Sequence, residues 1–349
     1  MASNKEDEKY IKKCFNLAKK GRFNVMPNPL VGCVIVKNGK VISKGYHQKF
    51  GEFHAERNAI LNSKEDLSNA TLYVNLEPCS HFGKTPPCTD LIIEKKIKRV
   101  VFSNLDPNKK VNGYKKLTEA NIDVQYGVLE NEGRELNKVF FKNIEKKLPY
   151  VALKTGATLD SKIATNSYQS KWITNEKSRL EVMKLRSSYQ AILTGSNTVL
   201  KDNPSLTSRI KNGISPIRII MDRSGVLDCK SNVFNDDVRV IVINNTDKKY
   251  PKNVEKIPFE NINSLLKKFY ELGIYSILIE AGGGLNSAFL QNRAVDEIYQ
   301  FIAPKILGKG INFTENLEIN NLSNSINAYD MKIKNFDDDI LLNYKLKYD

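Results

Sequence analysis

The stretches GEFHAERNAI (residues 51–60) and LEPCSHFGKTPPC (residues 76–88) decide the fold of this chain. They place His54, Cys79 and Cys88 around Glu56, in a sequence with only 3 histidines and 5 cysteines. Zinc binds imidazole nitrogen and thiolate sulfur, and a catalytic zinc keeps three protein ligands so that water takes the fourth position. The pattern therefore predicts a catalytic zinc with three protein ligands. Glu56 is placed to reach the metal-bound water without binding the metal.

The local pattern around the cysteines supports this prediction. Cys88 begins a predicted helix, whose N-terminal amides and dipole favour the thiolate, and Cys79 follows Pro78 at the end of a predicted strand. A His-x-Glu followed by Pro-Cys and a second Cys is the signature of zinc deaminases, in which the Glu acts as general acid and base. That signature has two residues between its cysteines, whereas Cys79 and Cys88 are separated by the eight residues SHFGKTPP.

The segments around the site alternate between helical and extended patterns. The sequence predicts a helix over residues 8–20 and a hairpin with an Asn-Gly turn over residues 30–46, followed by further strands and helices. This alternation is typical of an α/β fold. A charged helix is expected over residues 131–147, after which apolar strand patterns resume at Tyr150. We therefore expect two domains, residues 1–147 and 148–349.

Composition narrows the class of protein. The chain has 349 residues, of which 41% are hydrophobic and 27% charged, as in globular proteins. No apolar run approaches the roughly 20 residues of a membrane span, and the N-terminus lacks the apolar segment of a signal peptide. The few, scattered cysteines do not suit a disulfide scaffold, so a reduced, cytoplasmic protein is expected. Cys14 and Cys33 are expected to be core residues, and no role is assigned to Cys229.

The net charge of +15 raises the question of a nucleic-acid partner. Residues 1–148 contain 27 Lys and Arg against 17 Asp and Glu, and the remainder contains 27 against 22. The excess is spread over both halves and forms no dense basic block. We therefore expect neither a nucleic-acid nor a membrane partner, and the sequence leaves the oligomeric state open, with a homo-oligomer as one option.

Several motifs together resemble a known family. EPCSHFGKTPPC, MPNPLVGCVIV and GYHQKFGEFHAE are similar to the deaminase half of the bifunctional riboflavin-biosynthesis enzymes. In this family a diaminohydroxyphosphoribosylaminopyrimidine deaminase is fused to a 5-amino-6-(5-phosphoribosylamino)uracil reductase. The resemblance implies a cytidine-deaminase-like three-layer α/β/α domain followed by a dihydrofolate-reductase-like α/β domain. The long loop between the cysteines also distinguishes this family from zinc deaminases with shorter loops.

For the first domain the resemblance implies hydrolytic deamination of a phosphorylated pyrimidine. Glu56 would be the catalytic proton carrier beside a zinc held by His54, Cys79 and Cys88. Lys84, within the loop between the cysteines, would be a cation for the ribose 5-phosphate. The segment LDPNKKVNGY departs from the family pattern around Asn108. The implied substrate contacts are Asn28, His47, Lys84 and Asn108.

The second half carries reductase motifs in the family order: LKTGATLDSKIA, SKWIT, LRSSYQAILTGSNTVLKDNPSLTSR, PIRIIMDRSG, IEAGGG and DEIYQFIAPKILG. The resemblance implies hydride transfer from NADPH to the ribosyl group, with Lys154 and Glu280 as candidates for the proton source. Ser161, Gln190 and Ala281 depart from the customary residues, and none of them is a charged contact. The implied substrate contacts are Lys154, Ser170, Arg186, Leu206, Arg209 and Glu280. The implied cofactor contacts are Gly156, Trp172, Thr198, Asp202, Ser224, Gly282, Gly283 and Gly284.

Two other functions are compatible with parts of the pattern. One is a zinc deaminase of another base or nucleoside, or of tRNA adenosine, with an unrelated C-terminal domain; the long loop and the reductase motifs speak against it. The other is a nucleic-acid-binding module with a structural zinc. A structural zinc normally has four protein ligands, and the sequence offers three.

Overall fold

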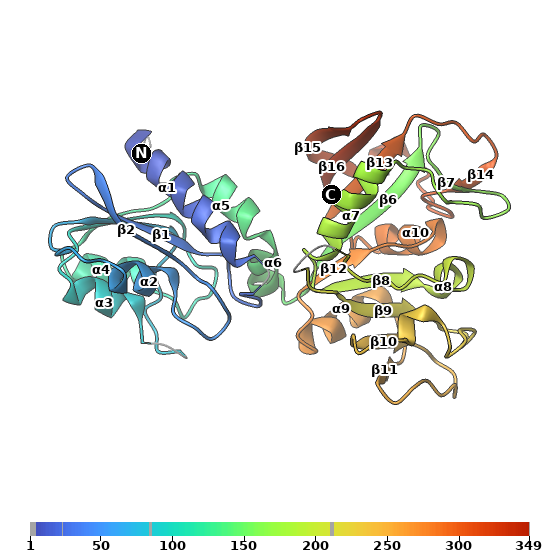
Figure 1. Cartoon of the computed structure of the whole chain (residues 1–349), viewed down its shortest axis with the longest axis horizontal. Coiled ribbons are helices and arrows are strands. Elements are labelled where there is room, and N and C mark those ends of the chain that lie inside the picture. The colour runs from blue at the N-terminus through green and yellow to red at the C-terminus, as the bar shows by residue number, and fades with distance from the viewer. Residues whose placement is uncertain (1–4, 23, 84–85, 210–212, 349) are drawn as a thin grey trace. The chain divides into compact units, whose positions relative to one another are not determined.

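The structure is a computed structural model that describes residues 5–22, 24–83, 86–209 and 213–348. The chain divides into two compact units, Met1–Lys147 and Leu148–Asp349. Each unit is built around its own β-sheet (Figure 1). No helix in the described ranges is both long and apolar enough to cross a bilayer.

The first unit contains a five-stranded sheet in the order β2-β1-β3-β4-β5. The hairpin β1–β2 turns at Asn38 and Gly39, both with positive φ, as the predicted Asn-Gly turn requires. β1 also pairs antiparallel with β3, while β3, β4 and β5 are parallel to one another. The strands are β1 (Gly32–Lys37), β2 (Lys40–Tyr46), β3 (Thr71–Leu76), β4 (Arg99–Asn104) and β5 (Asp123–Gln125).

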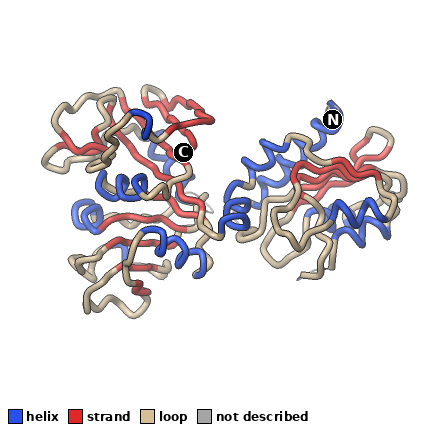
Figure 2. The backbone as a smooth tube through the Cα atoms, turned by 180° about the vertical axis from the view of Figure 1, so that it is seen from behind, coloured by secondary structure: helices blue, strands red, loops and turns tan. Residues whose placement is uncertain are grey.

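Helices cover both faces of this sheet, as Figures 1 and 2 show. Side chains of β1 alternate between the two cores: Cys33 and Ile35 pack with α2, α3 and α4, whereas Val34 and Val36 pack with α1. Cys14, on α1, is also fully buried, as expected for a packing residue. The unit is therefore the three-layer α/β/α fold that the resemblance implied. The helices are α1 (Lys5–Ala18), α2 (Ala55–Leu61), α3 (Cys88–Glu94), α4 (Gly113–Glu119), α5 (Glu130–Leu136) and α6 (Lys138–Lys146), with a 3-10 turn at Lys19–Gly21.

The prediction of a single helix over residues 131–147 is wrong in one respect, because two helices, α5 and α6, meet at Asn137. The buried Asn137 side chain uses both of its polar atoms on Leu30: Oδ1 accepts from the Leu30 N–H at 2.8 Å, and Nδ2 donates to the Leu30 carbonyl at 3.0 Å. Asn137 has φ −111° and ψ 24°, which interrupts the helix. A long-range tertiary contact thus divides a segment whose local pattern is helical.

The second unit is centred on a nine-stranded sheet in the order β11-β10-β9-β8-β12-β6-β13-β16-β15. The strands from β11 to β13 are parallel, and the C-terminal hairpin β15–β16 adds two antiparallel strands (Figure 1). A two-stranded ribbon, β7 with β14, lies beside it. The strands are β6 (Tyr150–Thr158), β7 (Lys162–Thr165), β8 (Ala191–Gly195), β9 (Ile217–Met221), β10 (Val240–Ile243), β11 (Val254–Ile257), β12 (Ser276–Ile279), β13 (Glu297–Ala303), β14 (Gly310–Asn312), β15 (Asn327–Phe336) and β16 (Asp339–Lys347).

Two cores lie on opposite faces of this sheet. Ile219 of β9 packs with α9 and α10, and the next residue, Ile220, packs with Val199 of α8. Because β6, β8, β9 and β12 are parallel, their carboxyl ends lie at one edge, where α/β sheets bind ligands. The helices are α7 (Glu176–Arg186), α8 (Ser196–Asp202), α9 (Ile262–Glu271) and α10 (Gly283–Gln291), with 3-10 turns at Asn232–Phe234 and Leu322–Asn324.

Candidate active sites

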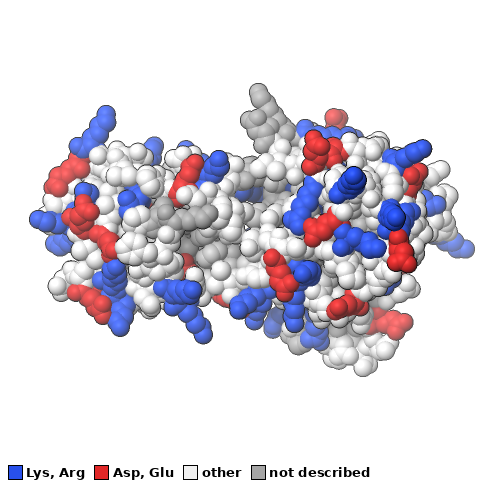
Figure 3. All heavy atoms as spheres, turned by 90° about the horizontal axis from the view of Figure 1, so that it is seen from below, with Lys and Arg blue, Asp and Glu red and all other residues white. Residues whose placement is uncertain are grey.

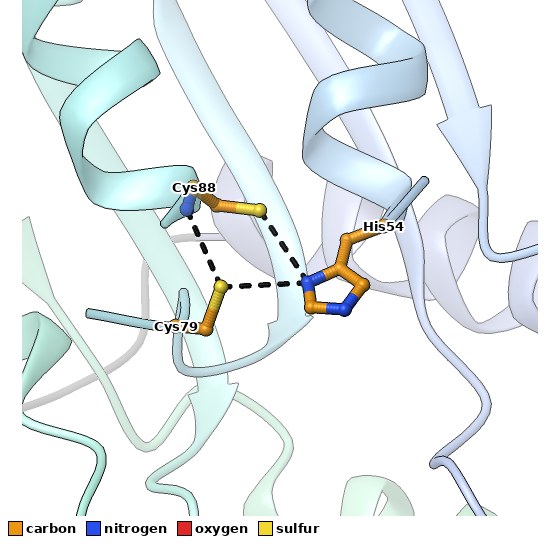
Figure 4. A group of neighbouring side chains, drawn as sticks. All are labelled: His54, Cys79 and Cys88. Atoms are coloured by element: carbon orange, nitrogen blue, oxygen red, sulfur yellow. Dashed lines mark hydrogen bonds between the residues drawn. The ribbon is translucent and has the colours of Figure 1, made fainter. Parts of the chain in front are cut away.

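Three side chains of the first unit converge as the sequence predicted. His54 is the N-cap of α2, Cys88 is the first residue of α3, and Cys79 lies in the connection after β3. Their ligand atoms all lie within 4.8 Å of one another (Figure 4). Within the described ranges this is the group of His, Cys, Asp and Glu side chains arranged to hold a metal ion.

The spacing of these three atoms fits zinc. The His54 Nδ1 atom lies 3.4 Å from the Cys79 sulfur and 3.6 Å from the Cys88 sulfur. Zinc bonds of about 2.3 Å to sulfur and about 2.05 Å to nitrogen, at a tetrahedral angle, place such ligands about 3.6 Å apart. The Cys88 amide also donates to the Cys79 sulfur at 3.3 Å, an outer contact of the kind that stabilises a ligating thiolate. Interaction with the Cys88 thiol lowers the pKa of Cys79 below its usual range.

Glu56 lies beside these ligands and is almost completely buried. It is the second residue of α2, two positions after His54. Burial, reinforced by the negative charge of Cys79, raises the pKa of Glu56 to about 7. A carboxyl group with a pKa near the working pH both accepts and releases a proton readily. The structure thus gives Glu56 the properties of a proton carrier.

A cavity of about 280 Å³ opens onto two of the metal ligands, His54 and Cys79, and onto Glu56. Asn28, His47 and Asn108 line it, together with His54 and Glu56. His81, for which no functional role was expected, lines it as well. Lys84 lies outside the described residues, so its expected contact with a phosphate stays a prediction.

The hydrogen bonds of His47 fix the orientation of Asn28. The Nδ1 atom of His47 lies 3.0 Å from the Phe53 carbonyl oxygen, which can only accept, so Nδ1 carries the proton. The Nε2 atom then accepts from the Asn28 side-chain amide, at 3.0 Å. Burial lowers the pKa of His47, which favours this neutral form. The remaining Asn28 carbonyl oxygen and amide hydrogen are left for a ligand in the cavity.

Glu77, which the sequence analysis did not single out as functional, organises the opposite wall of the cavity. Its carboxylate is buried and accepts from two backbone amides, that of Tyr114 at 2.8 Å and that of Asp106 at 3.0 Å. The Asp106 carboxylate in turn accepts from the backbone N–H of Asn108 at 2.8 Å. Glu77 thus connects the loop of Asn108 to the segment that carries Cys79. Its place in the quoted motif LEPC, immediately before the metal ligand, was the available signal.

The second unit has a larger cavity, of about 1040 Å³, at the carboxyl ends of its parallel strands. It brings together thirteen of the fourteen residues that the resemblance implied. The exception is Gly283: a β-carbon on this residue would lie 2.3 Å from the Asn312 carbonyl oxygen, so Gly283 packs against the chain. The lining residues among those expected are Lys154, Gly156, Ser170, Trp172, Arg186, Thr198, Asp202, Leu206, Arg209, Ser224, Glu280, Gly282 and Gly284.

A buried ion cluster lies at one end of this cavity. Glu280 is bonded bidentately by Arg186, at 2.7 and 3.0 Å, and its second oxygen also lies 2.8 Å from the Lys154 amine. Burial alone would raise the pKa of Glu280, but Arg186 and Lys154 outweigh it and hold the pKa near 2. Glu280 is therefore a fixed anion that positions two cations at the cavity wall.

Trp172, the single tryptophan of the chain, is 64% exposed and is not a core residue. The Arg179 guanidinium lies over its ring, at 4.5 Å from the centroid. The Lys305 amine donates to the carbonyl oxygens of Trp172 and Ile173, both at 2.8 Å. These contacts hold the indole at the edge of the cavity, where it can form a flat wall.

Family models match both units. A cytidine and deoxycytidylate deaminase zinc-binding region matches residues 4–104, and a RibD C-terminal domain matches residues 149–342. The protein is therefore an enzyme with a zinc-binding deaminase unit followed by a reductase unit.

Known proteins define the family more closely. The riboflavin biosynthesis protein RibD of Actinobacillus pleuropneumoniae is 43% identical over 86% of this chain and 85% of its own length. RibD of Aquifex aeolicus is 41% identical over 97% and 98%. A crystal structure of a diaminohydroxyphosphoribosylaminopyrimidine deaminase/5-amino-6-(5-phosphoribosylamino)uracil reductase from Thermotoga maritima is 43% identical, covers 98% of this chain and 99% of its own, and has a TM-score of 0.92. The chain belongs to the RibD family of bifunctional riboflavin-biosynthesis enzymes.

Proposed function

We propose that the first unit hydrolytically deaminates 2,5-diamino-6-(5-phosphoribosylamino)pyrimidin-4(3H)-one. We propose that the second unit then reduces the ribosyl side chain of the product to a ribitylamino phosphate with NADPH. The Thermotoga relative, described as both a deaminase and a reductase, supports the choice of substrates. The observation that carries the deaminase step is the cluster of three metal ligands, two of which line one cavity together with the buried Glu56.

In the first site the chain's own residues position the substrate and move protons. Zinc, when held by His54, Cys79 and Cys88, supplies a Lewis acid and an activated water. Glu56 accepts a proton from the attacking water and returns it to the ring or to the departing ammonia. Asn28, fixed by His47, offers an acceptor and a donor to the pyrimidine.

In the second site the ion cluster orients the substrate. NADPH supplies the hydride, and the protein aligns it with the sugar. Of the two candidates for the proton source, Lys154 fits better than Glu280, because a carboxyl group with a pKa near 2 is ionised at neutral pH. Arg186, held in the cavity wall by Glu280, remains a cation available to the sugar phosphate.

Product analysis tests both steps. The chain is incubated with the diaminopyrimidine phosphate, with and without NADPH, and the products are analysed by mass spectrometry. We expect exchange of an amino group for oxygen without NADPH, and a further gain of two hydrogens with it. Deamination without any NADPH oxidation would leave a single-activity deaminase; unchanged substrate in both samples would contradict the proposal as a whole.

We also propose that the chain binds no nucleic acid or membrane in this role, acts in the cytoplasm, and associates with a second copy of itself. Lys and Arg are interspersed with Asp and Glu on the face in Figure 3, which supports the first point. The edge strand β15 supports self-association, since Tyr329, Met331 and Ile333 on it are each more than half exposed. Light scattering of wild type and a Met331→Lys/Ile333→Lys variant tests this: a monomeric wild type would contradict it.

A further inference from the structure

The reductase cavity has a second end, where Ser224 is among the residues already expected to contact the cofactor. This end is apolar, and its lining residues belong to or pack against the core formed with α9 and α10. Such a surface accommodates a flat, uncharged ring better than a phosphate or a sugar. The lining side chains at this end are Met221, Phe259, Ile262, Leu285 and Ala288.

The order of the strands indicates which part of a bound dinucleotide would reach the apolar end of the cavity. Lys154 lies on β6 and Glu280 directly follows β12, whereas Arg223 follows β9, and the sheet runs in the order β9-β8-β12-β6. Neighbouring strands lie about 4.8 Å apart, so the ends of β6 and β9 are about 14 Å apart. A dinucleotide whose nicotinamide lay beside the ion cluster would extend its adenosine half over β8 to β9. The turn at Gly282 and Gly284, where a β-carbon would meet only open space, lies between the two ends.

Arg223 lies at the rim of the apolar end. It follows the last residue of β9 by two positions, is exposed, and stacks on Phe259 at 5.0 Å from the ring centroid. Among the described residues, no carboxylate lies within ion-pair distance of its guanidinium. The neighbouring Ser224 also lines the cavity and offers a hydroxyl group.

The other cations of the cavity have partners or assignments. Lys154 and Arg186 bind Glu280. Lys171 lies 3.9 Å from the Asp202 carboxylate, and Lys201 lies over the ring of Tyr168. Arg209 was already assigned to the substrate. Arg223 also lies outside the substrate set and the ion cluster, and it differs from Lys171 and Lys201 in following β9, beside the apolar end of the cavity.

We propose that Arg223 binds the 2′-phosphate on the adenosine ribose of the dinucleotide and thereby selects NADPH over NADH. This inference rests on the proposed reductase function. A guanidinium forms bidentate, charge-assisted hydrogen bonds with a phosphate, whereas the 2′-hydroxyl of NADH offers only a neutral partner. A carboxylate free to accept from that hydroxyl would favour NADH instead.

The acidic residue nearest in sequence, Asp222, is not free to do so. It is completely buried, and its carboxylate accepts from the amides of Val226 and Leu227 and from the Tyr250 hydroxyl, at 2.9, 3.1 and 2.7 Å. The local structure thus turns the acid inward and leaves Arg223 facing the cavity.

Nucleotide fragments test the proposal on the full chain. The affinities of 2′,5′-ADP and ADP are measured by calorimetry for wild type, Arg223→Gln and Arg239→Gln. Arg239 is a control because it is a partly exposed arginine of the same unit, paired with Glu255 and absent from the cavity lining. We expect Arg223→Gln to weaken 2′,5′-ADP binding roughly 10- to 100-fold and to change ADP binding by less than about twofold. Arg239→Gln leaves both affinities unchanged.

Steady-state kinetics separate this inference from the reductase function. Wild type should show a lower KM for NADPH than for NADH, and Arg223→Gln should remove most of the difference while retaining kcat. Turnover of NADPH and NADH with equal KM by wild type would overturn the role of Arg223 and leave the reductase standing. Equal weakening of 2′,5′-ADP and ADP in Arg223→Gln would also overturn it. Turnover of neither cofactor would overturn both the reductase function and the inference built on it.

Discussion

Two buried glutamates, one in each unit, have opposite acidities. Burial raises the pKa of Glu56 to about 7, with the negative charge of Cys79 adding to the effect. Burial also acts to raise the pKa of Glu280, yet Arg186 and Lys154 hold it near 2. The same side chain is therefore a proton carrier in one site and a permanent anion in the other. Partner charge, more than burial, decides which chemistry a buried carboxyl group performs.

The largest expected effect is the loss of deamination when Glu56, the proton carrier of this pair of glutamates, is replaced. Glu56→Gln keeps the size of the side chain but cannot carry a proton, so we expect deamination to fall roughly a hundredfold to ten-thousandfold. Zinc content, measured by atomic absorption, should stay at that of the wild type because Glu56 is not a ligand. The reductase step, followed by NADPH oxidation with the deaminated substrate, is an internal control on the same chain. Deamination at the wild-type rate would rule out the assigned role.

The role of Glu280 as a permanent anion is tested through the stability of the second unit. Because its folded pKa lies below its unfolded value, its contribution is fully present above about pH 4.5 and is lost as the pH falls toward 2. A shift of this size corresponds to something on the order of 3 kcal/mol at neutral pH. Glu280→Gln should therefore destabilise the second unit at pH 7, leaving Arg186 and Lys154 uncompensated.

Urea unfolding followed by tryptophan fluorescence measures this effect, since the single tryptophan, Trp172, lies in the second unit. We expect the difference in unfolding free energy between wild type and Glu280→Gln to shrink as the pH falls below about 4.5. A difference that stays constant down to pH 2 would show that the ionised carboxylate is not its source.

Glu77 is a third buried glutamate and extends the comparison. It has no role as a proton carrier, and among the described residues no cation forms an ion pair with it. Glu77→Gln leaves one of the amides of Asp106 and Tyr114 facing an NH2 group, so the loop that carries Asn108 loses an anchor. We expect kcat/KM of deamination to fall roughly tenfold, mainly through KM, in line with the loss of one charged hydrogen bond. Zinc content and reductase activity should not change. If the variant lost zinc instead, Glu77 would act by supporting the metal ligands and not through the loop of Asn108.

The two sites also differ in how far the sequence alone predicts them. His54, Glu56, Cys79 and Cys88 lie within 35 residues, and their chemistry demands fixed residue types, so spacing alone predicts a metal site. The reductase residues that line the cavity extend from Lys154 to Gly284, because parallel strands bring distant loops to one edge. Their types are individually common, and the order of motifs in a known family was needed to collect them. The contacts on which the proposed role of Arg223 and the role of Glu77 depend are seen in the folded chain.

At Asn137 the local sequence pattern predicts a continuous helix, whereas the fold has a break. Replacing this residue has the smallest expected effect of these substitutions. Its two hydrogen bonds to Leu30 hold the segment that leads into β1 and carries Asn28. In Asn137→Ala the two helices can merge, but the Leu30 N–H loses its partner, and we expect a net cost of about 1 kcal/mol. Amide hydrogen exchange in β1 and β3 should accelerate severalfold, while exchange in β6 and β12 of the other unit stays constant. Glu132→Ala, on the exposed surface of α5, is the control. If the variant exchanged like the control, helix continuity would have compensated fully for the lost tertiary contact, and the break at Asn137 would have no stabilising role.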